Sequence, residues 1–144
     1  MMTSTPTRRS TVTLLRHAES TFNRDGESGP DAAITPQGAA QASTLSGDYD
    51  YALVSAMRRA RETWAASGIA ATRVEFTTLA RERQSKTPCN GLEGEKGAGE
   101  DDEAFAFRMR QLWDTILWLG TRHDRILALT GKHVGNCQSI TLDL

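Results

Sequence analysis

The chain has little of several features that mark specialised classes of protein. Its 144 residues include only two cysteines, Cys89 and Cys137, which are far apart and form no CxxC pair. This excludes a disulfide scaffold and most zinc modules, and because it favours a reducing compartment we expect a cytoplasmic protein. No apolar run approaches the roughly 20 residues that a transmembrane helix needs. The first ten residues lack the apolar core of a secretory signal, so we expect no membrane partner.

An excess of charge of one sign is also missing. Lys plus Arg number 17 and Asp plus Glu number 18, which gives a formal net charge of −1. The chain as a whole therefore has no attraction for nucleic acid, and any anion binding must be local. The length suffices for one sizeable core. Because no repeat or linker divides the chain, we expect a single domain over residues 1–144, with residues 1–10 as a flexible tail.

Short apolar segments alternate with helical patterns along the chain. The expected strands are 11–15, 51–54, 74–78, 126–129 and 140–142. The expected helices are 36–45, capped by Thr35 and stopped by Gly47; 56–66, capped by Ser55; and 101–119. Strands that alternate with helices imply crossover connections. We therefore expect an α/β fold, a three-layer α/β/α sandwich around a mainly parallel sheet.

The helix expected over 101–119 shows the clearest periodicity. Its apolar residues recur at three- and four-residue steps, and they are Phe105, Met109, Leu112, Ile116 and Leu119, with Trp113 and Leu117 beside them. Such spacing marks one face of an amphipathic helix. We interpret this stripe as core. Residues 84–100, rich in Gly and charge, form a long loop by the same analysis.

Charged and polar side chains gather where the expected strands end. They are Arg16, His17, Glu19, Ser20 and Asn23 after the first strand, Ser55, Arg58, Arg59 and Arg61 after the second, Glu82 after the third, and Lys132 and His133 after the fourth. Ligands of parallel sheets bind at this edge. Arginine binds phosphate oxygens bidentately and a neutral imidazole can attack phosphorus, so the sequence predicts a phosphate site that holds a histidine.

Four segments follow one another in an order that belongs to a known family. They are Leu15-Arg16-His17-Ala18-Glu19-Ser20-Thr21-Phe22-Asn23, residues 34–42 (ITPQGAAQA), residues 55–63 (SAMRRARET), and residues 79–82 (LARE) with 91–94 (GLEG). The first resembles Arg-His-(Gly or Ala)-Glu-(Ser or Thr)-x-x-Asn, the signature of the histidine phosphatase superfamily, also called phosphoglycerate-mutase-like. The others resemble its L-T-x-x-G-x-x-Q-A, S-x-L-x-R-A-x-x-T and catalytic-acid blocks. The resemblance covers nearly the whole chain.

The resemblance implies a role for each matching residue. His17 would be the nucleophile that becomes phosphohistidine, and Arg16 and Arg59 would clamp the phosphoryl group, with Asn23 as a lesser contact. Glu82 would protonate the leaving oxygen and then help to activate water. Phosphoryl transfer needs charge stabilisation, in-line positioning and a proton donor, which these residue types supply. The family uses no metal, so we expect no metal and no other cofactor.

The chain departs from the family pattern after the fourth strand. The family ends that strand with Ser/Thr-His-Gly, but if Thr130 aligns with the Ser/Thr, Gly131 stands where the second histidine is expected. His133, two residues further along, contacts the substrate only if the loop folds back. Lys132 could supply positive charge there, as a point charge without imidazole geometry.

The sequence therefore predicts a phosphohydrolase that acts on phosphate monoesters or phosphoproteins through a phosphohistidine intermediate. The alternative, motivated by Gly131, is a degenerate family member that binds a phosphorylated ligand or partner without turnover. A phosphoglycerate-type mutase is disfavoured because the mutases that the chain resembles are substantially longer.

Two groups of charged residues can also be interpreted as surface residues without a role in the site. Glu82 sits between Arg81 and Arg83 and could belong to a mixed surface, with Glu93 or Glu95 as competing acids. Arg58 and Arg61 fit a solvated helix face better than a site.

The end of the sequence leaves the oligomeric state open. Residues 134–139 leave little room for the helix that relatives place before the closing strand. We therefore expect one face of the sheet to be thinly covered, which favours dimerisation.

Overall fold

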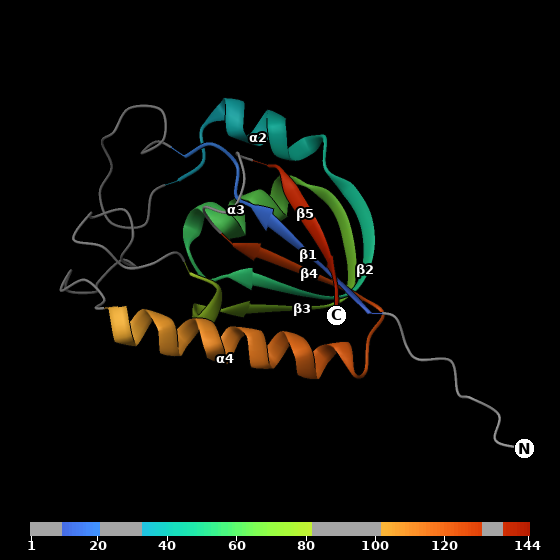
Figure 1. The fold of residues 1–144 in the computed structure, drawn as a ribbon. Helices are drawn as coiled ribbons and strands as arrows, with labels where there is room; N and C mark the ends of the chain where they lie inside the picture. Colours follow the sequence, from blue (N-terminus) through green and yellow to red (C-terminus); the bar gives the residue numbers. More distant parts are fainter. Residues whose placement is uncertain (1–9, 21–32, 82–101, 131–136) are drawn as a thin grey trace, which may run out of the picture.

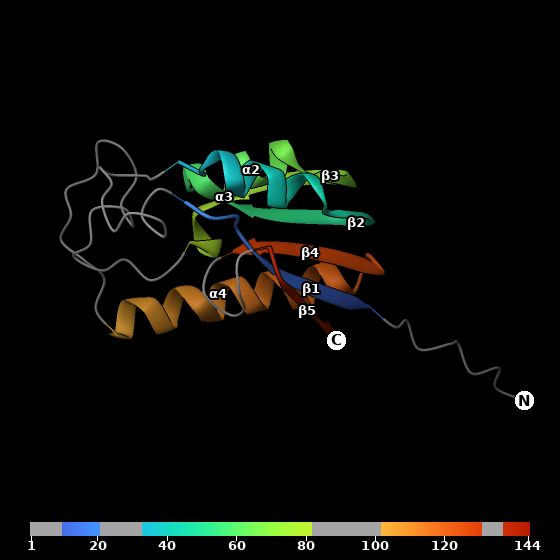
Figure 2. The ribbon, with the colours of Figure 1, turned by 90° about the horizontal axis from the view of Figure 1, so that it is seen from above.

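The computed structural model describes residues 10–20, 33–81, 102–130 and 137–144. Its elements are β1 (Thr11–Arg16), α2 (Pro36–Ser43), β2 (Ser46–Ser55), α3 (Arg58–Ala66), β3 (Gly68–Thr77), the 3-10 turn η1 (Thr78–Ala80), α4 (Asp102–Gly120), β4 (Arg125–Thr130) and β5 (Ser139–Asp143). The strands form one sheet in the order β3-β2-β4-β1-β5. Helices α2 and α3 cover one face and α4 covers the other (Figures 1 and 2), which confirms the three-layer α/β/α architecture.

The sheet is mainly parallel, as predicted. β1 and β2 both run parallel to β4, β3 runs parallel to β2, and β5 runs antiparallel to β1. The carboxyl ends of β1 to β4 therefore meet at one edge of the sheet (Figure 1). The register aligns Arg16 with Thr130 and Ser55 with Thr77. Since Val54 also aligns with Leu129, the four last strand residues form one row along that edge.

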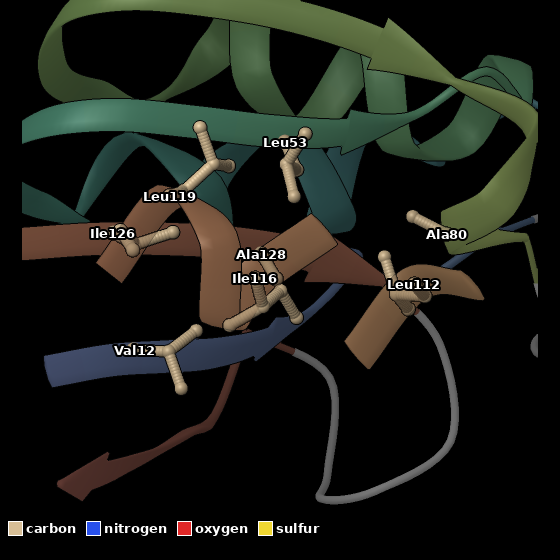
Figure 3. Packing of buried hydrophobic residues seen from close by; sticks show 8 residues of the cluster. All are labelled: Val12, Leu53, Ala80, Leu112, Ile116, Leu119, Ile126 and Ala128. Carbon is tan, nitrogen blue, oxygen red and sulfur yellow. The ribbon is translucent and has the colours of Figure 1, made fainter. Parts of the chain in front are cut away.

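The core lies on both faces of the sheet. On one face α4 packs on β1, β2 and β4 through buried residues shown in Figure 3: Val12, Leu53, Ala80, Leu112, Ile116, Leu119, Ile126 and Ala128. The other face buries Leu15, Ala52, Val54, Ala60, Leu127 and Leu129. Burial of apolar side chains on both faces explains why the strands show nearly continuous apolar runs.

The predicted stripe of α4 is buried only in part. Leu112, Ile116 and Leu119 are buried and Met109 packs against them, but Trp113 and Leu117 are exposed. Each helical residue is turned by about 100° from the one before it. Trp113 and Leu117 directly follow the buried Leu112 and Ile116, so they lie on the flank of α4 and not on the side packed against the core. Their assignment to the core was therefore wrong.

Several element boundaries also differ from the prediction. β2 begins at Ser46 and β3 at Gly68, well before their apolar segments, because the two strands pair from their first residues. Gly47 does not stop a helix but lies within β2 with φ of 138°, and α2 has already ended at Ser43. The helix cap expected at Ser55 is Met57, while the Ser55 hydroxyl accepts the Met57 N–H at 3.3 Å.

The expected flexible tail does not reach Ser10. This residue is buried, and its hydroxyl donates to the carbonyl oxygens of Gly120 and His123, the latter at 2.9 Å. It thereby satisfies carbonyl groups that the end of α4 leaves open. Residues 1–9 lie outside the described part of the chain. In that described part, none of the helices combines the length and the apolar character needed to cross a membrane.

Candidate active site

His17 is fixed at the junction of β1 and β4. It is 2% exposed, and its backbone N–H donates to the carbonyl oxygen of Thr130 at 3.1 Å. The ring atom Nδ1 lies 2.7 Å from the carbonyl oxygen of Ala18. A carbonyl oxygen only accepts hydrogen bonds, so Nδ1 carries the hydrogen and Nε2 of the neutral ring keeps its lone pair. The hydrogen bond to Ala18 thus fixes the tautomer of the imidazole.

Thr63 joins the end of β1 to the first turn of α3. Its fully buried hydroxyl accepts the N–H of Ala18 at 2.8 Å and donates to the carbonyl oxygen of Arg59 at 2.7 Å. One side chain therefore ties the residue that follows His17 to the backbone of Arg59. Arg59 is itself 3% exposed. The predicted nucleophile, His17, therefore lies on a loop that is tied to the backbone of the predicted phosphate-binding residue, Arg59.

The environment of Arg59 is unusual for a cation. The first turn of α3 contains no acidic residue, and Met57 provides no side-chain cap. The positive end of a helix dipole disfavours a nearby cation, and burial of the guanidinium adds a desolvation cost. Both costs fall when an anion binds at the helix N-terminus. Arg58, in contrast, is exposed and pairs with Glu62 at 3.4 Å, and Arg61 is exposed as well, which confirms their solvated face.

The start of β5 holds the end of β1 from the other side. The Arg16 N–H donates to the carbonyl oxygen of Gln138 at 3.1 Å, and the Cys137 N–H donates to the carbonyl oxygens of Arg16 at 3.2 Å and His17 at 3.4 Å. Cys137 has φ of 56°, a left-handed conformation uncommon outside glycine. Burial raises the pKa of its thiol. No pattern in the sequence indicated that Cys137 supports the histidine loop.

Helix α2 supports the loop after His17 through Glu19. The Thr35 hydroxyl donates to a carboxylate oxygen of Glu19 at 2.8 Å, and the Thr35 N–H donates to the Glu19 carbonyl oxygen at 2.9 Å. The Glu19 N–H in turn donates to the side-chain oxygen of Gln41 at 3.3 Å. Thr35 also caps α2, since its hydroxyl accepts the Gly38 N–H at 2.9 Å. The Thr-x-x-Gly-x-x-Gln spacing is therefore explained by one set of contacts to Glu19.

Gly38 permits this close approach. A Cβ at this position would lie 2.3 Å from the carbonyl oxygen of Glu19, closer than any side chain tolerates. The absent side chain lets α2 pack directly on the backbone of the histidine loop. Glu62 adds a contact from α3, because its carboxylate accepts the N–H of Ile34 at 3.0 Å.

The structure brings three of the predicted site residues to one edge of the sheet. Arg16 ends β1, His17 follows it, and Arg59 lies in the first turn of α3, which follows β2. The other predicted residues, Asn23, Glu82 and His133, lie outside the described residues, as do Gly131 and Lys132.

Arg81, which directly precedes Glu82, is a buried residue at this edge that sequence analysis did not single out. It follows η1 and is nearly inaccessible to solvent. The guanidinium of Arg108 on α4 donates to the carbonyl oxygens of Leu79 at 2.9 Å and Arg81 at 2.6 Å. This contact fixes the backbone directly before Glu82. A single arginine in a charged segment carries no sequence signal for such burial.

Comparisons with solved structures show that this fold recurs in phosphatases. A putative alpha-ribazole-5'-P phosphatase from Escherichia coli K-12 superposes with a TM-score of 0.69 at 19% identity, covering 85% of this chain and 74% of that one. A putative phosphohistidine phosphatase SixA from Nakamurella multipartitia gives 0.57 at 19% identity, covering 90% and 63%. A phosphoserine phosphatase mutant from Entamoeba histolytica, in complex with phosphoserine, gives 0.59 at 13% identity, covering 92% and 89%.

Comparison with protein families gives a match on the sequence itself. A search among curated proteins found no match. The model of the histidine phosphatase superfamily (branch 1), however, matches residues 12–87. This range is more than half of the chain and contains the histidine loop, Thr35, Gly38, Arg59 and Thr63. The chain therefore belongs to the histidine phosphatase superfamily.

Proposed function

We propose that the chain is a phosphohydrolase that transfers a phosphoryl group from its substrate to His17 and then to water. The observation that carries this proposal is the hydrogen bond from Nδ1 of His17 to the Ala18 carbonyl oxygen, which leaves Nε2 nucleophilic. The N–H of Ala18 is in turn connected through the Thr63 hydroxyl to the backbone carbonyl of the buried Arg59. A nucleophile of fixed tautomer, on a loop that is tied to the backbone of a buried arginine, suits attack on a phosphate group.

The proposed reaction has two displacement steps. In the first, Nε2 of His17 attacks phosphorus, the N–P bond forms and the bond to the leaving oxygen breaks. Glu82 gives its proton to that oxygen. In the second, Glu82 accepts a proton from water, whose oxygen attacks phosphorus and breaks the N–P bond. Arg16 and Arg59, with Asn23 as a lesser contact, stabilise the charge on the phosphoryl oxygens in both steps. No metal takes part in this scheme.

The substrate class that we propose is a phosphorylated small molecule or a phosphoprotein. The names of the similar structures include a ribazole phosphatase, a phosphohistidine phosphatase and a phosphoserine phosphatase. Their common chemistry is removal of a phosphoryl group.

The second candidate function is binding of a phosphorylated ligand or partner without turnover. β4 ends at Thr130, and if this residue aligns with the family's Ser/Thr, Gly131 stands where the second histidine is expected. A glycine supplies no charge to the phosphoryl group. In the phosphohydrolase proposal His133 or Lys132 supplies it instead, and His133→Ala therefore lowers turnover only if His133 is the substitute.

Trapping of the intermediate separates the two functions. The protein is mixed with excess para-nitrophenyl phosphate and quenched in alkaline denaturant. We expect a phosphoryl adduct on the peptide that contains His17, stable in alkali and lost in acid, because N–P bonds of histidine hydrolyse in acid. Absence of both an adduct and release of para-nitrophenol, with inorganic phosphate still bound, would establish the binding function instead.

Replacement of Thr63 tests the link between His17 and Arg59. Thr63→Val keeps the shape but removes the acceptor of the buried Ala18 N–H, which costs about 1–3 kcal/mol of stability. Because His17 is then less well positioned, we expect kcat for para-nitrophenyl phosphate to fall about 10- to 100-fold. Thr63→Ser keeps the hydroxyl and restores most of the activity. A loss of stability without a change in kcat would show that Thr63 has only a structural role.

A further inference from the structure

Two neighbouring elements expose large apolar side chains on the α4 side of the sheet. They are Trp113 and Leu117 of α4, 39% and 52% exposed, and Ile140, Leu142 and Leu144 at β5, 42%, 37% and 38% exposed. These five residues are called the α4–β5 patch. Contiguous apolar surface of more than a few hundred Å² is rare on monomers and marks an interaction site.

The register shows that the β5 residues of the patch share one face with the α4-side core. Ile140 lies opposite Leu14 and Leu142 lies opposite Val12. Val12 belongs to the core under α4, and Leu14 packs against that core. Opposite residues of an antiparallel pair project to the same face, so Ile140 and Leu142 lie on the α4 side of the sheet.

Helix geometry brings the α4 residues to the same surface. Trp113, Leu117 and Gly120 follow at steps of four and three residues, so they lie along one side of α4. A Cβ on Gly120 would lie 2.9 Å from Cδ1 of Leu144. The side of α4 that carries Trp113 and Leu117 therefore turns toward β5. Figure 1 shows β5 as the outermost strand, beside β1.

β5 also offers an open edge for strand pairing. It ends the sheet order, and among the described residues only β1 pairs with it. The Leu144 N–H bonds to Ser10 and the Gln138 carbonyl oxygen accepts from Arg16, so the even-numbered residues face β1. The backbone groups of the odd-numbered Ser139, Thr141 and Asp143 consequently point outward. β5 contains no Lys or Pro, which commonly protect exposed strand edges.

We infer that this edge and the α4–β5 patch form the interface of a homodimer. Two β5 strands pair antiparallel about a two-fold axis through Thr141, which places each Thr141 opposite its copy. Each Ser139 then faces Asp143 of the second copy, so no like charges are opposed. Each of these outward-facing residues belongs to a hydrogen-bonded pair, and each pair exchanges two N–H···O bonds.

The apolar side chains fit the same symmetric arrangement. With Thr141 on the axis, Ile140 lies opposite Leu142 of the second copy, which gives apolar cross-strand pairs. The axis stands perpendicular to the extended sheet, so both copies present α4 on the same side. The two patches therefore adjoin across the axis, where they add apolar contacts to the strand pairing. This self-complementarity is what favours a second copy over an unrelated partner.

Sedimentation of two lysine variants tests the interface. We expect the wild-type protein to sediment as a dimer in the micromolar range and Leu142→Lys to sediment as a folded monomer, since a charge would be buried at the axis. Val74→Lys is the matched control, because Val74 is 38% exposed on β3 at the opposite edge of the sheet. It should remain dimeric. A monomeric wild-type protein, or dissociation by Val74→Lys alone, would overturn the inference.

A cysteine placed on the axis tests the register without disturbing the apolar face. In a background in which Cys89 and Cys137 are Ser, Thr141→Cys should give a disulfide-linked dimer on mild oxidation, because Cα atoms of a hydrogen-bonded pair lie about 5.5 Å apart. Asp143→Cys should not, since its two copies lie two residues from the axis on opposite sides, roughly 13 Å apart. Equal cross-linking of both variants contradicts the register.

Discussion

Replacement of His17 by alanine should lower kcat for para-nitrophenyl phosphate by at least about 10³-fold, since loss of a catalytic nucleophile leaves only the contribution of binding groups. The remaining arginines still attract an anion, so inorganic phosphate should bind to the His17→Ala variant with similar affinity. This combination follows from the geometry. In the proposed mechanism the Nδ1 hydrogen bond prepares the ring for attack, whereas the backbone of Arg59 is held through Thr63.

His123→Ala is the matched control for this experiment. The ring of His123 packs against Tyr51, with 5.4 Å between ring centroids. His123 precedes β4, whereas the His17 N–H donates to the last residue of that strand. The two histidines therefore lie at opposite ends of β4. We expect kcat of His123→Ala to stay within about twofold of the wild-type value. Equal losses in both variants, or undiminished turnover by His17→Ala, contradict the proposed role.

The position of the site could be predicted from sequence because it depends on strand direction. Arg16 and His17 follow one apolar segment and Arg59 follows another, and parallel strands place their carboxyl ends together. The family signature assigned roles to the same residues. Neither argument required knowledge of how the side chains pack. The three-layer architecture was predictable for the same reason, since alternation of strands and helices determines it.

The supporting contacts could not be predicted, because they join residues far apart in the chain. Thr63 stands within the matched motif, yet its bonds to Ala18 and Arg59 depend on where α3 lies on the sheet. The burial of Arg81 depends likewise on α4. A Thr or Arg side chain occurs both at the surface and in the interior, so the residue type alone does not predict whether it is buried.

The exposure of Trp113 and Leu117 on α4 could not be predicted for a related reason. Periodicity identified a long amphipathic helix, but the width of its buried stripe depends on how many strands lie beneath it. Trp113 and Leu117 lie on the side of α4 that turns toward β5, where the sheet ends. The expectation of a thinly covered sheet face stays a prediction, because it rests on residues 134–139, of which 134–136 lie outside the described part of the chain.

Arg59→Ala is the second substitution for which we expect a large effect. Removal of one preorganised group that stabilises transition-state charge costs about 10²- to 10³-fold in kcat. Affinity for inorganic phosphate should fall as well, which distinguishes this variant from His17→Ala. Arg59→Lys keeps the charge but loses the planar fork, so it should recover phosphate binding better than kcat. Steady-state kinetics and phosphate titration of the three proteins give these values.

The control for Arg59 lies two residues away on the same helix. Arg61 is exposed, and its Nε donates to the carbonyl oxygen of Ala56 at 3.0 Å. Arg61→Ala removes the same charge from the same helix, so any general electrostatic attraction of substrate falls equally in both variants. Because only Arg59 is buried and bonded through Thr63 to the histidine loop, only its loss should lower kcat. Similar, salt-sensitive losses in both variants would instead show that the arginines act by long-range attraction and not by direct contact.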